Sequence, residues 1–344
     1  MAYRAASSPA AWHGAQLGRD DRWIRTFTPA ALDELHRATK QVIDRGIPLY
    51  AATKTDFPLD RAAEQLALIG EEIENGRGLL LLRGIEARRY SKDELRQMFW
   101  GMSLYLGTAV PFAQQAAKFD DVMDFGDKPG TPFSRGNRTR AELMFHTDTA
   151  DITGLLCLST ARQGGISKVA SSITIHNEML KRRPDLLELL FEPYHSSRNT
   201  EERPGEPRYY TMPVFGMRDG WFASHISRRL VRAAQEFPEA PRLRPEQAEA
   251  LELHAAIAEE CCLHFALQPG DIEFFCNHTL LHSRTEFFDG NSDEQRRHLI
   301  RIWISTPNSR PLPESFKVLY GRVGRGELRG GHWRGDHLPQ ETHG

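Results

Sequence analysis

The sequence predicts an α+β protein in which helices surround a β-sandwich or β-barrel core. Three observations predict this fold class. Apolar residues recur at helical spacing through the first hundred positions. Short apolar runs alternate with Gly and Ser between about 141 and 175. Further apolar runs, bounded by turn residues, lie between about 268 and 305. Helices therefore come first, and strands dominate the middle and the end, which is typical of one α+β domain.

Three helices are expected in the first hundred residues. Each is predicted from apolar residues on one face and from its start signal, over about 28–43, 60–75 and 91–99. Pro29 suits the first turn of the first helix, and Ser91 with Glu94 forms a capping box that begins the third. The run from Leu79 to Leu82 is short, apolar and bounded by glycine, so it is predicted to be a buried strand.

The rest of the chain is expected to mix strands with two further helices. These helices are predicted over about 177–190, with an interruption near Pro184, and over about 245–262. The segment 204–213 is polar, aromatic and rich in proline, which is typical of a loop or lid. Later strands are predicted over 272–275 and 297–305.

A length of 344 residues allows one large domain or two ordinary ones. The order of the elements favours one structural domain with three parts: a helical N-terminal part packed on the core, a core with helical insertions, and a C-terminal tail. These parts are expected over 1–78, 79–313 and 314–344. The chain from Pro307 onwards is rich in Gly, Pro and Arg and is expected to be surface structure.

Composition disfavours several classes of protein. Lys and Arg number 44 against 46 Asp and Glu, a net charge of -2, so no nucleic-acid partner is expected. No stretch of 18 apolar residues occurs, and the N-terminus lacks the apolar segment of a secretory signal, so no membrane partner is expected. The four cysteines contain no CxxC pair, which disfavours a thiolate zinc site and fits a reducing, cytoplasmic setting. A small-molecule partner is expected, and a homo-oligomer stays open.

His146 and Asp148 form the first candidate motif, Phe-His-Thr-Asp. On a strand, residues i and i+2 point to the same face, so both side chains can reach one metal ion. Alone the pair is weak evidence, because roughly two His-x-acid matches are expected by chance in a chain of this composition. The other match is His176 with Glu178 at a predicted helix start, where Glu178 is more simply an acid in the first turn.

Two histidines compete as the third metal ligand. His278 lies in a polar turn beside Asn277, whereas His282 begins the returning strand. A rigid strand aims a side chain better than a turn does, so His282 is the preferred ligand. The alternative is that either histidine merely forms hydrogen bonds near the turn.

The last predicted strand places Arg297, Leu299, Arg301 and Trp303 on one face. Two arginines beside Leu and Trp are not typical of a solvent-exposed face. The guanidinium fork matches a carboxylate, so this face suits a dicarboxylate, with salt bridges to Asp or Glu as the alternative. Two imidazoles and one carboxylate form the three-ligand face that binds Fe(II) and leaves positions open for a co-substrate and oxygen.

In their order and spacing, these motifs resemble the TauD/TfdA family of Fe(II)/2-oxoglutarate dioxygenases. The similarity runs from about Leu79 to Pro313. The segments that carry it are 141–148, 164–167, 269–271, Asn277 with His282, and Arg297 with Arg301.

The resemblance implies a double-stranded β-helix, or jelly-roll, core. It implies His146, Asp148 and His282 as iron ligands. It also implies that the distal carboxylate of 2-oxoglutarate meets Arg297 and the hydroxyl of Ser167, after a Gly164-Gly165 turn that lets the backbone bend. The alternative for Ser167 is a turn hydroxyl bonded to its own backbone.

The resemblance further implies a reaction in which O2 and 2-oxoglutarate give succinate and CO2 while a C–H bond of a small substrate is oxidised. Hydroxylation is the usual outcome, and desaturation and ring formation stay open. The substrate is expected to be anionic or amino-acid-like. Candidate contacts to the substrate are Arg138, Asn277, Arg284 and, on the expected lid, Tyr209. Arg301 can serve either the substrate or 2-oxoglutarate, and Asn277 can instead fix the turn.

Two other functions use the same residues. A zinc-dependent hydrolase can activate water with the same three ligands, but Arg297 and Ser167 then have no role. A non-catalytic jelly roll can bind a small acid, and it predicts no turnover of 2-oxoglutarate.

Overall fold

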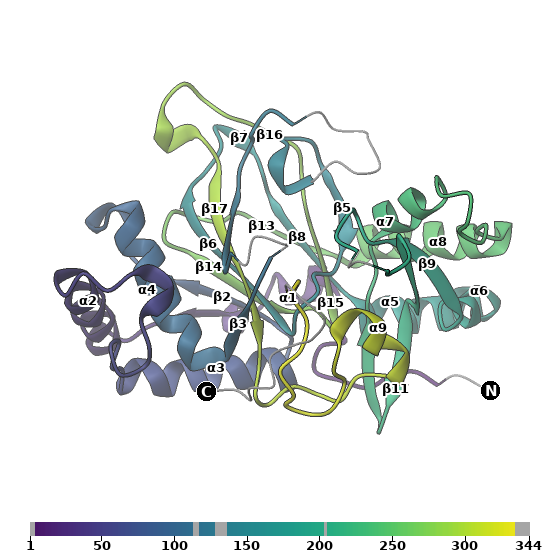
Figure 1. The fold of residues 1–344 in the computed structure, drawn as a ribbon, viewed down its shortest axis with the longest axis horizontal. Coiled ribbons are helices and arrows are strands. Elements are labelled where there is room, and N and C mark those ends of the chain that lie inside the picture. Colours follow the sequence, from purple (N-terminus) through teal and green to yellow (C-terminus); the bar gives the residue numbers. More distant parts are fainter. Residues whose placement is uncertain (1–3, 113–116, 128–135, 203–204, 334–344) are drawn as a thin grey trace.

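The computed structural model describes residues 4–112, 117–127, 136–202 and 205–333. Two β-sheets occupy the centre of the molecule, with the N-terminal helices on one side and a second group of helices on the other (Figure 1). The apolar cluster between the sheets includes Leu81, Leu155 and Phe275 from one sheet and Val169 and Leu280 from the other. The α+β class is therefore confirmed, with two sheet layers packed face to face.

The larger sheet has seven strands and is antiparallel except for its edge pair, β1 and β2. The strands follow in the order β1 (Ile24–Thr26), β2 (Leu79–Arg83), β14 (Ile272–Cys276), β6 (Ile152–Ser159), β17 (His298–Ser305) and β3 (Thr108–Val110), with β4 (Phe119–Val122) also paired to β17. The three strands predicted in this sheet, over 79–82, 272–275 and 297–305, are confirmed to within about one residue at each end.

The smaller sheet is antiparallel throughout and carries His146, His282 and Ser167. The order of its strands is β13 (Leu263–Phe265), β8 (Ser167–Ser171), β15 (Leu280–Arg284) and β5 (Leu143–His146). Short strand pairs elsewhere in the described chain are β9 (Pro193–Ser197) with β10 (Tyr209–Pro213), β11 (Phe215–Arg218) with β12 (Trp221–Ser224), and β7 (Gln163–Gly164) with β16 (Phe287–Phe288).

Helices α2 (Pro29–Asp44), α3 (Arg61–Asn75) and α4 (Lys92–Leu106) cover the outer face of the larger sheet. Their local start signals act as predicted: Thr28 accepts a hydrogen bond from the backbone of Ala31, and Ser91 and Glu94 form both bonds of the capping box. The three N-terminal helices are confirmed, although α4 continues beyond residue 99. No helix within the described ranges is both long and apolar enough to cross a lipid bilayer.

Helices α5 (Ser172–Arg182), α6 (Pro184–Leu189), α7 (Arg228–Ala234) and α8 (Pro245–Cys261) cover the outer face of the smaller sheet. The interruption at Pro184 and the helix from Pro245 are confirmed. The expected helix start at residue 177 is wrong. The hydroxyl of Ser171, the last residue of β8, accepts a hydrogen bond from the backbone N–H of Thr174 (3.0 Å), so the helix begins directly after the strand.

The expected loop over 204–213 is confirmed at 205–208 and wrong at 209–213, and Pro204 lies outside the described residues. Tyr209–Pro213 is strand β10, paired with β9, and Tyr210 and Met212 are buried. The hydrogen-bonding partner of this strand lies more than ten residues earlier, so a local reading of composition did not reveal it.

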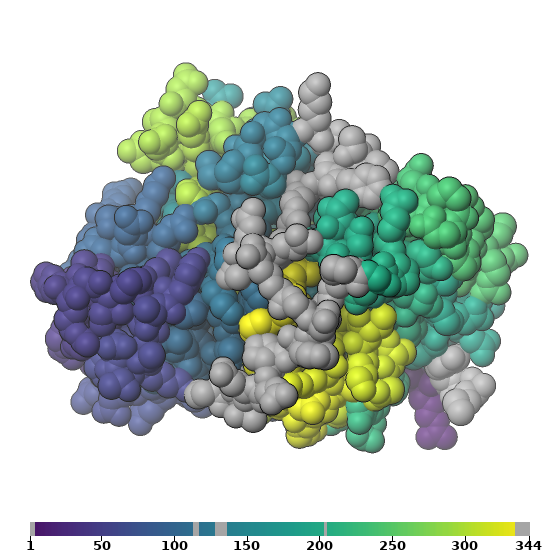
Figure 2. Space-filling view, viewed as in Figure 1, coloured from purple at the N-terminus to yellow at the C-terminus, as the bar shows by residue number. Residues whose placement is uncertain are grey.

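The C-terminal segment is also more buried than expected. One apolar cluster joins Leu312, Phe316 and Tyr320 of this segment to Tyr210 and Met212. Tyr320 is the last residue of the short helix α9 (Lys317–Tyr320). On one face of the molecule, this segment, in yellow, lies between the N-terminal helices and the second helical group (Figure 2). The prediction of surface structure from Pro307 onwards is therefore wrong for these residues. A short helix, α1 (Gly14–Leu17), lies near the N-terminus.

Candidate metal and co-substrate site

His146, Asp148 and His282 come together where β5 pairs with β15. His146 is the register partner of His282, and the centroids of their rings lie 4.1 Å apart. Asp148 follows β5 by two residues, and its Oδ2 lies 3.7 Å from His282 Nε2. One ligand atom from each of the three residues lies within 4.8 Å of the other two. At these distances, small side-chain adjustments would let one metal ion contact all three side chains.

Hydrogen bonds hold two of these side chains in orientation. His146 Nδ1 lies 2.9 Å from the carbonyl oxygen of Met144, an acceptor only, so Nδ1 donates and Nε2 keeps its lone pair. Thr153 Oγ1 donates to Asp148 Oδ2 (2.9 Å), and the backbone N–H of Asp148 donates to Asn277 Oδ1 (2.9 Å). Asn277 Nδ2 donates in turn to Thr153 Oγ1 (3.0 Å). Contacts of this kind orient metal ligands.

The protonation states of the three side chains suit a divalent cation. Burial lowers the pKa of His146 and of His282, so both imidazoles are neutral near pH 7. Burial alone would raise the pKa of Asp148, but the charge of nearby Arg301 holds it below its ordinary value. Neutral imidazoles and an ionised carboxylate are the coordinating forms, and two nitrogens with one oxygen fit Fe(II).

Replacing Thr153 with valine is expected to weaken iron binding by about 10- to 100-fold, the usual effect of losing a contact that orients a ligand. The variant keeps the shape of the side chain but removes the hydrogen bond to Asp148 Oδ2. Anaerobic titration with Fe(II) measures the effect. The control is Thr153→Ser, which keeps the hydroxyl and is expected to restore most of the affinity. Equal iron affinity in the valine variant and the parent protein would contradict this role for Thr153.

Arg301 forms ion pairs with two carboxylates of the chain, one of them that of the candidate metal ligand Asp148. Its Nη1 donates to Asp148 Oδ1 (3.0 Å), and its Nη2 donates to Asp120 Oδ2 (2.8 Å). Its guanidinium also lies beside the rings of Phe112 and Trp303, 5.0 and 5.3 Å from their centroids. The prediction that Arg301 binds 2-oxoglutarate gains no support from these contacts, which favour a role in holding Asp148.

Arg297 and Ser167 lie on opposite sheets and face the same interior space. Arg297 is buried just before β17, and its Nη1 has no hydrogen-bond partner among the described residues. A Cβ atom at Gly165 (φ +69°) would come within 3.0 Å of Arg297 Cδ and Nε, so the turn requires glycine there. The hydroxyl of Ser167 donates to the buried carboxylate of Glu273 (2.9 Å). An orphaned buried guanidinium nitrogen is what a carboxylate ligand requires.

Two of the predicted substrate residues are bonded within the chain instead. The guanidinium of Arg284 is buried and donates to the backbone carbonyls of Thr139, Arg140 and Ala141. Asn277 is fully buried, with both ends of its amide bonded as described above. These contacts favour supporting roles for both residues, and their contact with a substrate stays a prediction.

The other two predicted substrate residues also have partners in the fold. Arg138 Nε donates to Asp127 Oδ2 (2.8 Å), and its guanidinium lies 4.0 Å from the centroid of the Phe125 ring. Tyr209 is half-buried on β10 and packs against the cluster around Phe237. None of these contacts involves the three candidate metal ligands, so the substrate roles of both residues stay predictions.

The histidines that competed with this set lie elsewhere. His278 is fully buried, and its Nε2 lies 2.8 Å from Asp151 Oδ1. His176 Nδ1 lies 3.0 Å from Asn177 Oδ1, while Glu178 pairs with Lys181. The structure therefore brings His282, and neither His278 nor His176, to the His146/Asp148 pair.

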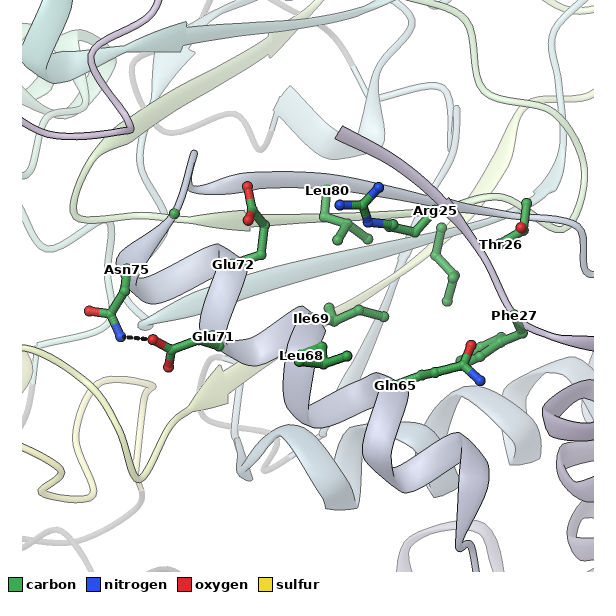
Figure 3. Close-up of a pocket in the computed structure, with 12 residues that line it drawn as sticks. Arg25, Thr26, Phe27, Gln65, Leu68, Ile69, Glu71, Glu72, Asn75 and Leu80 are labelled. Carbon is green, nitrogen blue, oxygen red and sulfur yellow. Dashed lines mark hydrogen bonds between the residues drawn. The ribbon is translucent and has the colours of Figure 1, made fainter. Parts of the chain in front are cut away.

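Two other features of the described chain could be mistaken for this site. Glu259, Cys262 and His264 also bring ligand atoms within 4.8 Å of one another, but this cluster is largely exposed, and Glu259 already pairs with the ammonium of Lys168 (2.7 Å). A hollow of about 460 Å³ lies between α3 and the strands β1 and β2, lined by side chains such as Leu68 and Ile69 (Figure 3). The lining of the hollow contains none of the candidate ligands.

Sequence reasoning missed Thr153, Asp120 and Glu273. Thr153 and Asp120 lie in segments without a distinctive pattern. Thr153 contacts Asp148 from five residues away, whereas Asp120 contacts Arg301 because β4 pairs with β17. Glu273 carried a usable signal, because it is a lone acid in the apolar run Ile-Glu-Phe-Phe-Cys of β14. A charged residue inside a buried strand calls for a functional or structural partner.

Comparisons with known proteins find a matching family and relatives that cover most of this chain. The sequence profile of the family described as "Taurine catabolism dioxygenase TauD, TfdA family" matches residues 44–303. FR-33289 synthase of Streptomyces rubellomurinus (strain ATCC 31215) is 29% identical over 316 residues, covering 89% of this chain and 92% of the relative. The taurine hydroxylase-like protein SAT17 of Stachybotrys chartarum is 30% identical over 304 residues, covering 85% and 77%.

Solved structures share the fold at low sequence identity. An asparagine oxygenase in complex with Fe(II), 2S,3S-3-hydroxyasparagine and succinate aligns with a TM-score of 0.62 at 17% identity, covering 83% of this chain and 94% of that one. The non-heme iron oxygenase OrfP in complex with Fe and alpha-ketoglutaric acid aligns with a TM-score of 0.59 at 15% identity, covering 82% and 93%.

Proposed function

The chain belongs to the taurine catabolism dioxygenase TauD, TfdA family, and we propose that it uses Fe(II), 2-oxoglutarate and O2 to hydroxylate a C–H bond of a small anionic or amino-acid-like substrate. Two observations carry this proposal: His146, Asp148 and His282 meet at one place, and the buried Arg297 has an Nη1 without a hydrogen-bond partner among the described residues. Iron and 2-oxoglutarate, when bound, supply the oxidising chemistry.

The residues of the chain have separate tasks in this proposal. His146, Asp148 and His282 hold the metal, and Thr153 and Arg301 keep the Asp148 carboxylate in place through its two oxygens. Arg297 binds the distal carboxylate of 2-oxoglutarate, and Ser167 donates to the same carboxylate. A zinc hydrolase would leave the buried Arg297 without a partner, so the oxygenase accounts for more of the site.

The substrate class rests on the charge around the site and on the relatives. Burial is the main cause of the lowered pKa of His146, and the charges of Arg301 and Arg229 add to it. Arg301 is paired with Asp148 and Asp120. The positive charge of Arg229 near the metal ligands favours an anionic substrate. Phe112 and Trp303, with ring centroids 4.4 Å apart, provide an apolar surface beside Arg301. Two solved structures with a similar fold contain hydroxylated asparagine or hydroxylated arginine. These complexes support an amino-acid-like substrate for this chain.

We also propose a jelly-roll core, a division of the single domain into three parts, and a cytoplasmic location. The two facing sheets are those expected for a double-stranded β-helix. The division into 1–78, 79–313 and 314–344 within one domain is part of the proposal, as is a cytoplasmic location, which fits four free cysteines.

Replacing Arg297 with methionine is expected to weaken 2-oxoglutarate binding by about 10- to 150-fold, because the lost charge-assisted hydrogen bonds are worth about 1.5–3 kcal/mol. Binding is measured without oxygen, from the weak visible charge-transfer band that forms when Fe(II) and 2-oxoglutarate are added together. Arg296→Met is the matched control, because Arg296 is adjacent but exposed. Unchanged binding of 2-oxoglutarate by the Arg297 variant would show that Arg297 does not bind the distal carboxylate. A parent protein that binds neither iron nor 2-oxoglutarate would overturn the proposed function.

A further inference from the structure

Glu273 is a buried acid that the proposed mechanism has not yet used. It lies in β14, between Leu81 of β2 and Leu155 of β6 in the register of the larger sheet. Its side chain lies on the sheet face that carries Phe275, within the apolar layer between the two sheets. A carboxylate in such surroundings is costly to keep ionised without a paired cation.

The hydrogen bonds of Glu273 place it at the proposed co-substrate pocket. Its Oε2 accepts from Ser167 Oγ at 2.9 Å, and Ser167 is the residue proposed to bind the distal carboxylate of 2-oxoglutarate. Arg297, the other proposed partner of that carboxylate, is near enough to influence the pKa of Glu273, yet within the described chain no ion pair joins the two side chains. A carboxylate bound by both Arg297 and Ser167 therefore lies beside that of Glu273.

Two carboxylates side by side in a buried pocket cannot both stay ionised without a large cost. Burial already raises the pKa of Glu273 to about 7, although the Ser167 hydroxyl and the Arg297 charge lower it. The Cys157 thiol of β6 is neutral, since burial raises its pKa to about 12. Arg284 and Asp289 both interact with Arg297, and their opposite charges leave no net positive charge to offset a second carboxylate.

On the premise of the proposed function, we propose that Glu273 is a third recognition residue for 2-oxoglutarate and binds it in the protonated form. As the diacid enters, Glu273 takes up one proton from solvent, and the resulting carboxyl O–H donates a hydrogen bond to the distal carboxylate. The Ser167 hydroxyl then donates to the same distal carboxylate in place of its hydrogen bond to the Glu273 carboxylate. The chain then presents Arg297, Ser167 and Glu273 as three donors to one diacid.

Affinity for the unreactive analogue N-oxalylglycine, measured with Fe(II) under anaerobic conditions between pH 6 and pH 8.5, tests this proposal. In the parent protein, affinity is expected to fall as the pH rises above about 7, approaching tenfold per pH unit, because each binding event requires one proton. Glu273→Gln keeps a neutral donor of similar shape, so its affinity is expected to be nearly independent of pH. The metal ligands are the same in both proteins, so their titration cancels in the comparison.

Calorimetry of the parent protein supplies a second readout that needs no variant. At pH 8, the binding heat in buffers of different ionisation enthalpy is expected to report the uptake of close to one proton per analogue bound. No proton uptake, or the same pH dependence in the parent and Glu273→Gln proteins, would overturn the role of Glu273 while leaving the oxygenase in place. Failure of both proteins to bind the analogue at every pH would overturn the oxygenase itself.

Discussion

Replacing Arg329 with methionine is expected to lower the free energy of unfolding by about 3–5 kcal/mol, the usual cost of breaking a buried ion pair from one side. Arg329 and Asp151 are both fully buried, and Arg329 Nε donates to Asp151 Oδ1 at 2.7 Å. The variant leaves the Asp151 carboxylate with His278, Ser305 and the backbone of Thr306 as partners but without its cation. Denaturation with urea, followed by circular dichroism, measures the change.

The control for this prediction is Arg296→Met, which removes an exposed arginine paired with Asp293. That substitution is expected to change the free energy of unfolding by no more than about 1 kcal/mol. The double variant Arg329→Met with Asp151→Asn is expected to recover part of the loss, because the uncompensated charge is then gone. Equal stability of the Arg329 variant and the parent protein would show that the ion pair does not hold the C-terminal segment in place.

Local signals in the sequence were enough to predict the helices on the outside of the larger sheet. The cap at Thr28, the capping box at Ser91 and the spacing of apolar residues in α3 act within a few residues, so neighbouring sequence contains the whole signal. For His146 and Asp148 the strand argument holds only in part, because His146 ends β5 whereas Asp148 lies two residues beyond it.

Features that depend on distant partners were not predictable in this way. The expectation that Arg301 and Arg284 bind small molecules rested on residue type, whereas Asp120 and the carbonyls that surround Arg284 are supplied by segments far away in the sequence. The burial of Arg329 depends on Asp151, which lies 178 positions earlier. Placing His282 opposite His146 requires the register of β15 on β5, and the sequence favoured His282 only because strands are rigid.

Replacing His282 with alanine is expected to weaken iron binding by more than about 100-fold and to abolish the formation of succinate from 2-oxoglutarate. Loss of a contact that merely orients a ligand typically costs about 10- to 100-fold in metal affinity, so loss of a ligand itself is expected to cost more. The buried His282 Nε2 lies 3.7 Å from Asp148 Oδ2, and no other described histidine joins this cluster besides His146. Iron content after anaerobic reconstitution and desalting measures the first effect.

His278→Gln is the matched comparison, because His278 was the rival ligand, lies four residues before His282 and is also buried. Glutamine keeps a side-chain donor for Asp151, so this variant is expected to bind iron with the stoichiometry of the parent protein while its free energy of unfolding falls. The two substitutions therefore separate a metal ligand from a structural histidine four residues away. If the glutamine variant lost iron and the alanine variant kept it, the third ligand would be His278, and the pairing of β15 with β5 would no longer explain the site.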